Sequence, residues 1–553
     1  MKPATSTVDP FDLNIATRNT VGDMLTRTAD VSPERVAVVD GDRRITYAEF
    51  EHDAEAIARG IIELDGAPEQ GHPIAVFMPN GYEFLATYFG IAKSGRVVLP
   101  INYGQTPQEI AWILGDAEAR HAVVHETLLP IVRGALAAGA QLDTIVVHRV
   151  SEEEIAVDGA RVVDLASLRA TEVDGELRII IASDDVVQCL YTSGTTAAPK
   201  SALATHNAVV TGVMNNALTV GESWVRRPPT VLVVLPLFHV TALNTLTKPV
   251  LAVGGTIVLH NGFNPAAVLD TMEAERVTMF TGLPMMWAAM IAEFTRQARD
   301  LSSIDTAMYA MAQMPERVLA GMDVMMPNAL KLLGSGQTEV IPATTYQRPE
   351  HRHTKNASWG MSATTVRTRI MDENGNILPP GEVGEIVYRG PHVTAGYWKR
   401  SDANEAAFKH GWFHSGDIGH IDEEGVIWFT DRSKDIIKSG GENVSSMKVE
   451  RTMASAPGVV ECCVVATPHE YWGEAVTLVA VVDSLPEASE VDETAFRLAQ
   501  QALAGDLIAY AKEHLAKFEV PKRVEFIAEL PKTTTGKVRK NVVRDLVTGS
   551  TSE

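Results

Sequence analysis

Short runs of apolar, β-branched residues alternate with stretches of helical periodicity through the first three-quarters of the chain. The clearest apolar runs are PIAVFMP (73–79), TIVVH (144–148), VLVVLPL (231–237), GTIVLH (255–260) and VTMFTGLP (277–284). Between them, EFLATYFGIAKSG (83–95) and NPAAVLDTMEAER (264–276) carry apolar residues at helical spacing. This alternation predicts a large α/β domain of largely parallel sheets flanked by helices.

Beyond about residue 365 the pattern changes to short strands joined by tight turns. The strand-like segments are TRIMDENGNIL, GEIVYRG and HIDEEGVIWFT, in which DENGN and DEEG have the composition of hairpin turns. The sequence therefore predicts a β-rich subdomain at the end of the large domain.

A domain boundary is predicted near DRSKD (431–435), the segment that contains Lys434. After it come a helical segment SMKVERTMAS, strands VECCVVAT and AVTLVAVVD, a helix LIAYAKEHLAKF and a strand RVEFIAE. We expect a large domain at 1–432 and a small, mobile α+β domain at 433–553.

The bulk composition narrows the class of protein. The chain has 553 residues, 45% of them apolar, and its mean hydropathy is +0.01, which is typical of globular proteins with more than one domain. No apolar run is long enough to cross a bilayer, and MKPATSTVDP does not have the pattern of a secretory signal. The three cysteines lack metal-site spacing, so we expect reduced thiols and a cytoplasmic location.

The net charge of -22 argues against nucleic acid, or an anionic membrane surface, as the main partner. A nucleotide ligand would have to be bound by a few basic residues focused on it. The first candidate segment is SGTTAAPKS (193–201), which follows the strand-like VVQCLY (186–191). It resembles a phosphate loop, except that Pro199 stands where a glycine N–H would face the anion.

Such a loop still offers backbone donors, hydroxyl groups and one ammonium group to an anion. The residues concerned are Thr192, Ser193, Gly194, Thr195, Thr196 and Lys200. Taken alone, a surface turn rich in serine, threonine and glycine is the better interpretation.

Four further segments carry candidate chemistry. GSGQTE (334–339) places Gln337, Thr338 and Glu339 on a glycine-rich turn, where a carboxylate beside phosphates can recruit Mg²⁺. FHSGDIG (413–419) sets Asp417 at a turn suited to ribose hydroxyls. Arg432 lies in DRSKD, and Lys537 lies in the terminal PKTTTGK. Each alone is also compatible with a turn former, a surface ion pair or a solvated charge.

The joint order of these motifs resembles that of the adenylate-forming superfamily, which holds acyl-CoA synthetases, luciferases and the adenylation domains of peptide synthetases. The matching segments are YTSGTTAAPK, LPLFHV (235–240), GSGQTE, FHSGDIG, DRSKDIIKSGGENV (431–444) and PKTTTGK. The resemblance extends from ITYAEF (45–50) to the end of the chain.

The resemblance implies a two-step ligase that uses ATP, Mg²⁺ and CoA. Lys537 would be the catalytic lysine that bridges the substrate carboxylate and the α-phosphate. Glu339 and Thr338 would hold Mg²⁺, while the 192–196 loop and Lys200 would hold the phosphates. Asp417 and Arg432 match the family's ribose contacts.

For the second step, the resemblance implies that the small domain turns about DRSKD and presents SGGEN (439–443) to the thiol. Lys438, Gly440 and Gly441 would then contact CoA, since glycine lets a thin pantetheine arm lie close to the backbone. His239 resembles the gate between the acyl and thiol channels; a histidine that merely ends a strand or helix is the alternative.

The chain departs from the family's pattern around adenine. Ser335 replaces the usual aromatic residue before G-x-T-E, AMAQM (310–314) replaces a Gly-Gly-Ala-Pro stretch, and Ala197 replaces a glycine. Met311 and Gln313 therefore stand where the other wall of the adenine slot is expected. The phosphate and ribose motifs are unaffected by these changes, so ATP remains the expected nucleotide.

The acyl pocket is expected to involve LPLFHV, GLPMMWAAM (282–290), MYAMAQM and LLGSG, with Met285, Met286, Met311 and Met314 as an adaptable apolar wall or as ordinary core. A hydrophobic carboxylic acid, whether fatty, aryl or alicyclic, fits these segments best. Two alternatives stay open: an acyl-AMP ligase that delivers to a carrier protein, and a non-catalytic nucleotide-binding homologue. A homodimer is among the open assemblies.

Overall fold

The computed structural model describes residues 8–64, 66–192, 199–220, 227–310, 314–440, 442–483, 485, 493–533 and 536–549. The chain divides into two compact units. The first unit comprises Met1–Thr192, Pro199–Thr368 and Tyr388–Phe413, and the second comprises Ser193–Ala198, Arg369–Val387 and His414–Glu553. The boundary expected at residues 432/433 stays a prediction.

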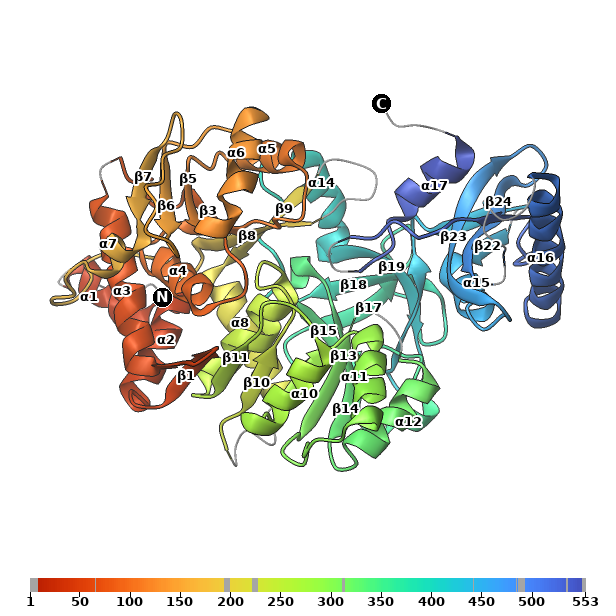
Figure 1. Ribbon diagram of the computed structural model, residues 1–553, viewed down its shortest axis with the longest axis horizontal. Helices are drawn as coiled ribbons and strands as arrows, with labels where there is room; N and C mark the ends of the chain where they lie inside the picture. The colour runs from red at the N-terminus through yellow and green to blue at the C-terminus, as the bar shows by residue number, and fades with distance from the viewer. Residues whose placement is uncertain are drawn as a thin grey trace. The chain divides into compact units, whose positions relative to one another are not determined.

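A nine-stranded sheet dominates the first unit, in the order β16-β15-β14-β13-β12-β10-β11-β1-β2 (Figure 1). Its strands are β1 (Val36–Asp40), β2 (Arg43–Thr46), β10 (Thr230–Val233), β11 (Thr256–Leu259), β12 (Met279–Gly282), β13 (Thr306–Ala310), β14 (Leu330–Gly336), β15 (Ala343–Tyr346) and β16 (Met361–Ser362). Neighbouring strands from β14 through to β1 are parallel, and β2, β15 and β16 add antiparallel pairs at the two edges.

The first unit also contains a seven-stranded sheet, in the order β7-β6-β5-β3-β4-β8-β9. Its strands are β3 (Pro73–Phe77), β4 (Val97–Pro100), β5 (His121–His125), β6 (Thr144–His148), β7 (Arg161–Asp164), β8 (Val186–Thr192) and β9 (Lys200–Thr205). All neighbours are parallel except β8 and β9. The predicted α/β class with largely parallel sheets is confirmed.

Helices cover these sheets on both faces, as parallel sheets require. They are α1 (Pro10–Thr17), α2 (Val21–Val31), α3 (Tyr47–Glu63), α4 (Tyr82–Lys93), α5 (Pro107–Asp116), α6 (Leu129–Ala137), α7 (Leu165–Arg169), α8 (His206–Val220), α9 (Lys248–Ala252), α10 (Pro265–Ala274), α11 (Pro284–Arg296), α12 (Glu316–Met325), α13 (His351–Thr354) and α14 (Ser401–Ala407). Thr46 and Glu49 form a capping box that begins α3, which explains why the helix starts directly after β2.

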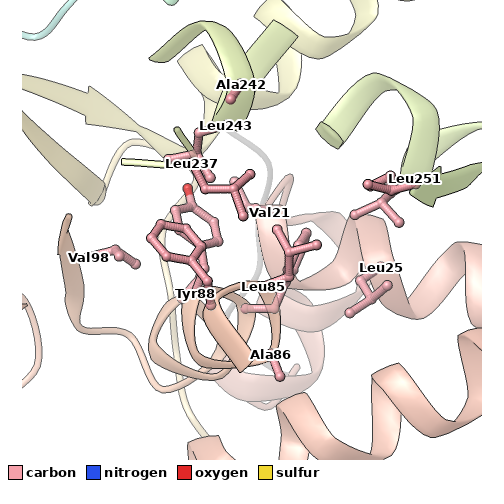
Figure 2. Packing of buried hydrophobic residues seen from close by; sticks show 14 of the residues in the cluster. Val21, Leu25, Leu85, Ala86, Tyr88, Val98, Leu237, Ala242, Leu243 and Leu251 are labelled. Carbon is pink, nitrogen blue, oxygen red and sulfur yellow. The ribbon is translucent and has the colours of Figure 1, made fainter. Parts of the chain in front are cut away.

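Helix α4 is buried on every side from Tyr82 to Ala92, because it packs in the core between elements of both sheets. Figure 2 shows this core, with residues from α2, α4, β4 and the segment that follows β10: Val21, Leu25, Leu85, Ala86, Tyr88, Val98, Leu237, Ala242, Leu243 and Leu251. The Tyr88 hydroxyl is satisfied within it, since it donates to Gln188 Oε1 at 2.6 Å.

A π-helix, η3 (Thr241–Thr247), runs into α9 at the edge of this core. Lys248, the first residue of α9, is completely buried. Its ammonium nitrogen donates to Asn244 Oδ1 at 2.6 Å and to the Leu243 carbonyl at 3.1 Å, and lies 4.0 Å from the centre of the Tyr88 ring. The lysine thereby satisfies a carbonyl group of the widened helical turn.

The second unit contains two sheets. One has the order β17-β18-β19-β20, with β17 (Arg367–Met371) and β18 (Gly384–Arg389) reaching its boundary with the first unit, followed by β19 (Phe413–Ile421) and β20 (Ile427–Arg432). The other has the order β22-β21-β24-β23, with β25 paired to β24. Its elements are β21 (Ile436–Ser439), β22 (Glu442–Ser445), α15 (Ser446–Met453), β23 (Val459–His469), β24 (Gly473–Val482), α16 (Glu493–His514), β25 (Arg523–Phe526) and α17 (Lys540–Thr548). The expected β-rich sheet and small α+β domain are both present.

Several predicted elements need correction in extent. The run VLVVLPL was expected to be one strand to residue 237, but β10 ends at Val233, before Pro236, which lacks the N–H that a central strand needs. The helix expected over 507–518 begins at Glu493 and ends at His514. Among the described residues, no helix is both long enough and apolar enough to cross a membrane.

Candidate functional site

The hairpin GSGQTE connects β14 to β15 in the first unit. Gly336 has no room for a side chain, because a Cβ there would lie 1.8 Å from the Pro342 carbonyl oxygen. Gln337 donates its N–H to that same carbonyl at 2.9 Å. A single helical turn over Thr338–Val340 follows, and both Thr338 and Glu339 are half-buried on it. Tight packing of the turn thus fixes the two residues predicted to hold Mg²⁺.

Glu339 is bound by a tyrosine that the sequence analysis missed. The Tyr397 hydroxyl donates to Glu339 Oε1 at 3.0 Å, and the Thr394 N–H donates to the Glu339 carbonyl at 2.6 Å. Burial, together with the neighbouring Glu339 carboxylate, raises the pKa of Tyr397, so the hydroxyl stays protonated and acts as a donor. The only sequence signal was an aromatic pair in AGYW (395–398), which has no distinctive spacing to GSGQTE.

Tyr397 also connects Glu339 to the strands that flank the phosphate-loop candidate. Its ring centre lies 5.2 Å from the Lys200 ammonium nitrogen, and its backbone bridges to Ala202 in β9. Thr192 and Lys200 are register partners on β8 and β9, with Thr192 Oγ1 donating to the Lys200 carbonyl at 3.3 Å. The structure therefore brings Thr192, Lys200 and Glu339 into one neighbourhood. Ser193, Gly194, Thr195 and Thr196 lie outside the described residues, as does Ala197.

His239 lies on the segment between β10 and the π-helix. Its N–H donates to the Pro236 carbonyl at 3.1 Å, and its carbonyl accepts from the Leu243 N–H at 3.0 Å. Its ring packs beside Phe238, with centroids 4.8 Å apart, and Phe238 contacts the Tyr103 ring edge-on at 5.1 Å. The histidine is half-buried on an aromatic wall, next to a helix type that occurs often at functional sites.

The methionines expected around the acyl pocket differ in environment. Met286 and Met314 are buried in the core on one face of the nine-stranded sheet, whereas 67% of Met285 is exposed. Met311 and Gln313, which would form one wall of the adenine slot, lie outside the described residues. Ser335, on the other side of the expected slot, is half-buried at the end of β14.

The two predicted ribose residues are neighbours in the second unit. Asp417 on β19 and Arg432 on β20 are register partners, and Arg432 Nε lies 3.1 Å from Asp417 Oδ1. Asp417 is buried to 2% exposure, and the Arg432 side chain is about half exposed at 47%. A carboxylate that is paired with a guanidinium group is fixed in orientation. Such a carboxylate is suited to recognition of two hydroxyl groups.

The SGGEN segment forms the turn between β21 and β22. Gly440 has a φ of +62°, and a Cβ there would meet the Trp472 ring at 2.7 Å. Its N–H donates to the Trp472 carbonyl at 2.8 Å. Lys438 is exposed, and its N–H donates to Glu474 Oε2 at 2.7 Å. The conformation and Trp472 together explain the glycine, while Gly441 lies outside the described residues.

Lys537 is exposed on a short closed loop before α17. The Thr533 N–H donates to the Lys537 carbonyl at 2.8 Å, and the Lys537 N–H donates to Thr533 Oγ1 at 3.2 Å. Lys532 and Val538 form an isolated antiparallel bridge at the base of the loop. These contacts hold the backbone of Lys537, the lysine predicted to be catalytic, close to Thr533.

The three cysteines form no disulfide. Cys189 and Cys463 are buried and Cys462 is half-buried, and burial raises the pKa of the Cys189 and Cys462 thiols to about 12. Within the described parts of the chain, no group of three histidine, cysteine, aspartate or glutamate side chains could hold a metal ion.

Comparison with known proteins finds matches along most of the chain. Residues 25–398 match the AMP-binding enzyme family, and residues 448–537 match the AMP-binding enzyme C-terminal domain. A feruloyl-CoA synthase from Amycolatopsis sp. is 33% identical over 525 residues, covering 95% of this chain and 98% of the relative. This chain belongs to the AMP-binding enzyme family.

Other relatives of this AMP-binding enzyme show the same coverage. An indoleacetate–CoA ligase from Aromatoleum aromaticum is 31% identical over 96% of this chain and 99% of that protein. The crystal structure of ATP-bound MatB from Rhodopseudomonas palustris aligns with a TM-score of 0.79 and 26% identity, over 95% of this chain and 98% of that protein. The resemblance to the adenylate-forming superfamily inferred from the motifs is confirmed.

Proposed function

We propose that this protein is an ATP-dependent, AMP-forming acyl-CoA ligase that acts on a hydrophobic carboxylic acid in the cytoplasm. The observation that carries the proposal is the neighbourhood of Glu339, Tyr397, Lys200 and Thr192, which sets a carboxylate beside the two strands that begin and end the phosphate-loop segment. The feruloyl-CoA synthase and the indoleacetate–CoA ligase named above match this chain along nearly their whole length. Both names include CoA, which supports the second step.

In the first step, an oxygen of the substrate carboxylate attacks the α-phosphorus of ATP, and pyrophosphate leaves. Both reactants are anionic, so their approach needs focused positive charge in a chain of net charge -22. The Lys537 ammonium would bridge the carboxylate and the α-phosphate, and Lys200 would bind the departing phosphates. Asp417 would orient the ribose through its hydroxyl groups.

Mg²⁺ fits the donor set on the GSGQTE hairpin. This ion is usually bound through one or two carboxylates together with phosphate oxygens and water. The Glu339 carboxylate and the Thr338 hydroxyl provide such ligands, and Tyr397 fixes one carboxylate oxygen. When bound, the ion would neutralise phosphate charge.

In the second step, the sulfur of CoA attacks the carbonyl carbon of the acyl-adenylate, the thioester bond forms, and AMP leaves. The SGGEN turn with Lys438 and Gly440 would line the path of the pantetheine arm. His239 would separate this path from the acyl group. The apolar surroundings of His239, with Phe238 and Tyr103, favour an acid without charge on its acyl part.

The test is a panel of aryl, alicyclic and fatty acids, assayed for AMP release and thioester formation with and without CoA. We expect acid-dependent AMP release and a thioester that forms only with free CoA. Adenylate without transfer to CoA would instead indicate an acyl-AMP ligase that needs a carrier protein, and inactivity with every acid would indicate a non-catalytic homologue.

Lys537→Ala tests the assignment of the first step. Pyrophosphate exchange should fall by about 10²- to 10³-fold, because one preorganised charge at the transition state is removed. Thioester formation from supplied acyl-adenylate should survive. Equal loss of both half-reactions in a folded variant would contradict the role given to Lys537.

A further inference from the structure

A second lysine lies three positions after Lys537. Lys540, the first residue of α17, turns its side chain into the second unit, and only 16% of that side chain is exposed. Its ammonium nitrogen lies 2.8 Å from Glu450 Oε1 and donates to Ser446 Oγ at 2.6 Å. Both partners belong to α15, so the start of α17 is fastened to that helix by an ion pair and a hydrogen bond.

The partners of Lys540 are themselves held in place. The Ser446 hydroxyl donates to Asp431 Oδ2 at 2.7 Å, and Asp431 also accepts from the Ser445 hydroxyl and the Met447 N–H at 3.2 and 3.1 Å. Glu450 Oε1 accepts from the Val464 N–H at 2.7 Å. One polar network therefore ties together β20, the beginning of α15, strand β23 and the beginning of α17.

Lys540 stays charged in this network. Burial acts to lower its pKa, but the nearby acidic groups, Glu450 first and Asp431 among them, together act to raise it, so the pKa of Lys540 is raised above its ordinary value. Charged, hydrogen-bonded contacts of this kind restrict direction as well as distance.

The Lys537 loop connects directly to this anchor. Arg539 donates its N–H to the Pro531 carbonyl at 2.8 Å, which closes the base of the loop one residue before Lys540. Three residues of chain span at most about 10 Å, so the position of Lys540 limits where the Lys537 backbone can lie. Lys537 itself is exposed, and its backbone N–H and carbonyl are hydrogen-bonded to Thr533.

We propose that Lys540 is a positioning residue for adenylate formation: by its contacts with Glu450 and Ser446 it fixes the loop that presents Lys537. The inference rests on the proposed function, in which Lys537 acts in the first step alone. Lys540 does not touch the reactants in this account. A lysine that only stabilised the fold would affect both half-reactions alike, because the SGGEN turn belongs to the same unit.

The experiment compares Lys540→Met with the wild type in the full-length chain. Pyrophosphate exchange should fall by about 10- to 100-fold in kcat, since a misplacement of about 1 Å in a reacting group has effects of that size. The KM values for ATP and acid should change little, and thioester formation from supplied acyl-adenylate should stay within about twofold. Lys540→Arg keeps the charge and should recover most of the exchange activity.

Lys532→Met is the matched control. Lys532 lies at the other side of the same loop and pairs with Glu461 at 2.9 Å, where 33% and 35% of the two side chains are exposed. Loss of such an exposed pair should leave both half-reactions near the wild-type rates. If Lys540→Met does not fold, Ser446→Ala provides the same test, because it removes the other contact of the Lys540 ammonium.

Amide hydrogen exchange over residues 531–540 separates this inference from the proposed function. Exchange should be faster in Lys540→Met than in the wild type or Lys532→Met. An unchanged rate of amide hydrogen exchange would overturn the positioning role. An unchanged rate of pyrophosphate exchange, or an equal loss of both half-reactions, would also overturn it. If the wild type forms no adenylate with any acid, the proposed function fails. The amide hydrogen exchange data then decide by themselves whether Lys540 anchors the loop.

Discussion

Two lysines with little exposed side chain, Lys248 in the first unit and Lys540 in the second, have pKa values shifted in opposite directions. Within the described parts of the chain, the partners of Lys248 are neutral, namely the Leu243 carbonyl, Asn244 and the Tyr88 ring, and burial lowers its pKa well below the ordinary value. Lys540 in the second unit faces Glu450, and its pKa is raised despite burial. Nearby carboxylates thus oppose the lowering of a lysine pKa that burial causes.

The difference shows what each region can tolerate. Around Lys248 the contacts among the described residues are neutral, and the lysine nitrogen donates to a carbonyl group of the π-helix. Around Lys540 a charge pair holds together segments far apart in the chain. A charge pair of this kind restricts the geometry of the two groups. Removal of one partner is strongly destabilising, because the other charge is left buried without its partner.

Glu450→Gln should have the largest effect on this contrast, because it removes the carboxylate that directly contacts the Lys540 ammonium. We expect the free energy of unfolding of the second unit to fall by about 3 to 5 kcal/mol. Urea unfolding followed by tryptophan fluorescence measures the change. Glu461→Gln, which breaks the exposed pair with Lys532, is the control and should change stability by about 0 to 1 kcal/mol. Equal effects of the two variants would contradict the contrast.

His206 extends the comparison, as a second group that the first unit keeps neutral. It is 1% exposed at the start of α8, and its Nδ1 accepts from the Val21 N–H at 3.2 Å. Burial lowers the pKa of His206 to about 4, with Asp23 acting to raise it and Arg18 to lower it.

Because the folded pKa of His206 lies below the unfolded value of about 6.5, its contribution to stability is complete above pH 6.5 and is lost as the pH falls towards 4. The loss should amount to about 3 kcal/mol. Unfolding of the wild type and of His206→Gln, measured between pH 7.5 and 4.5, should converge at low pH. Parallel curves would show that His206 is protonated in the fold.

Lys248→Met should have a smaller effect at neutral pH. The variant loses two hydrogen bonds but also removes the penalty of an amine that must give up its proton on folding, so we expect about 1 to 2 kcal/mol of destabilisation at pH 7. The pKa of Lys248 is lowered in the folded state. Between that lowered pKa and the ordinary value of 10.5, the unfolded state therefore binds more protons than the folded state.

Wild-type stability should accordingly rise with pH by up to about 1.4 kcal/mol per pH unit more than that of Lys248→Met. Denaturation of both proteins at pH 7, 8 and 9 measures the slope. An identical slope would mean that the buried lysine keeps its proton.

Tyr397→Phe should have the smallest effect. It removes the neutral donor from Glu339 Oε1, worth about 1 kcal/mol for a single hydrogen bond. We expect a 3- to 10-fold fall in kcat/KM and a higher Mg²⁺ requirement, since the carboxylate is less well fixed. Initial rates over a Mg²⁺ titration provide the measurement, with Tyr510→Phe in α16 as the control. A change in KM for the acid alone would place Tyr397 elsewhere in the mechanism.

The sequence predicts those helices and strands whose apolar pattern lies within one continuous segment. The apolar runs 73–79 and 144–148 contain β3 and β6, and the helical run 83–95 contains nearly all of α4, because a buried parallel strand and a core helix need continuous apolar residues. Motif order also indicated the family. The neighbourhood of Thr192, Lys200 and Glu339 is consistent with roles assigned from short motifs, which stay predictions.

The features that were missed depend on residues far apart in the chain. Tyr397 lies 58 positions from Glu339, and Lys540 lies 94 positions from Ser446, so no local pattern marks either contact. The π-helix was missed because its widened turn has nearly the same apolar spacing as an ordinary helix. Gly440 was expected to contact pantetheine, with a plain turn as the alternative, and its left-handed backbone and the Trp472 ring already require a glycine there.

Only Val538 and Arg539 separate the projecting lysine from the anchored one. The length of this segment is therefore more constrained than its composition. Inserting one residue between the lysines would displace the loop tip by up to about 3.5 Å with every side chain unchanged. Homologues should accordingly vary in the type of residue at 538 and 539 far more readily than in their number.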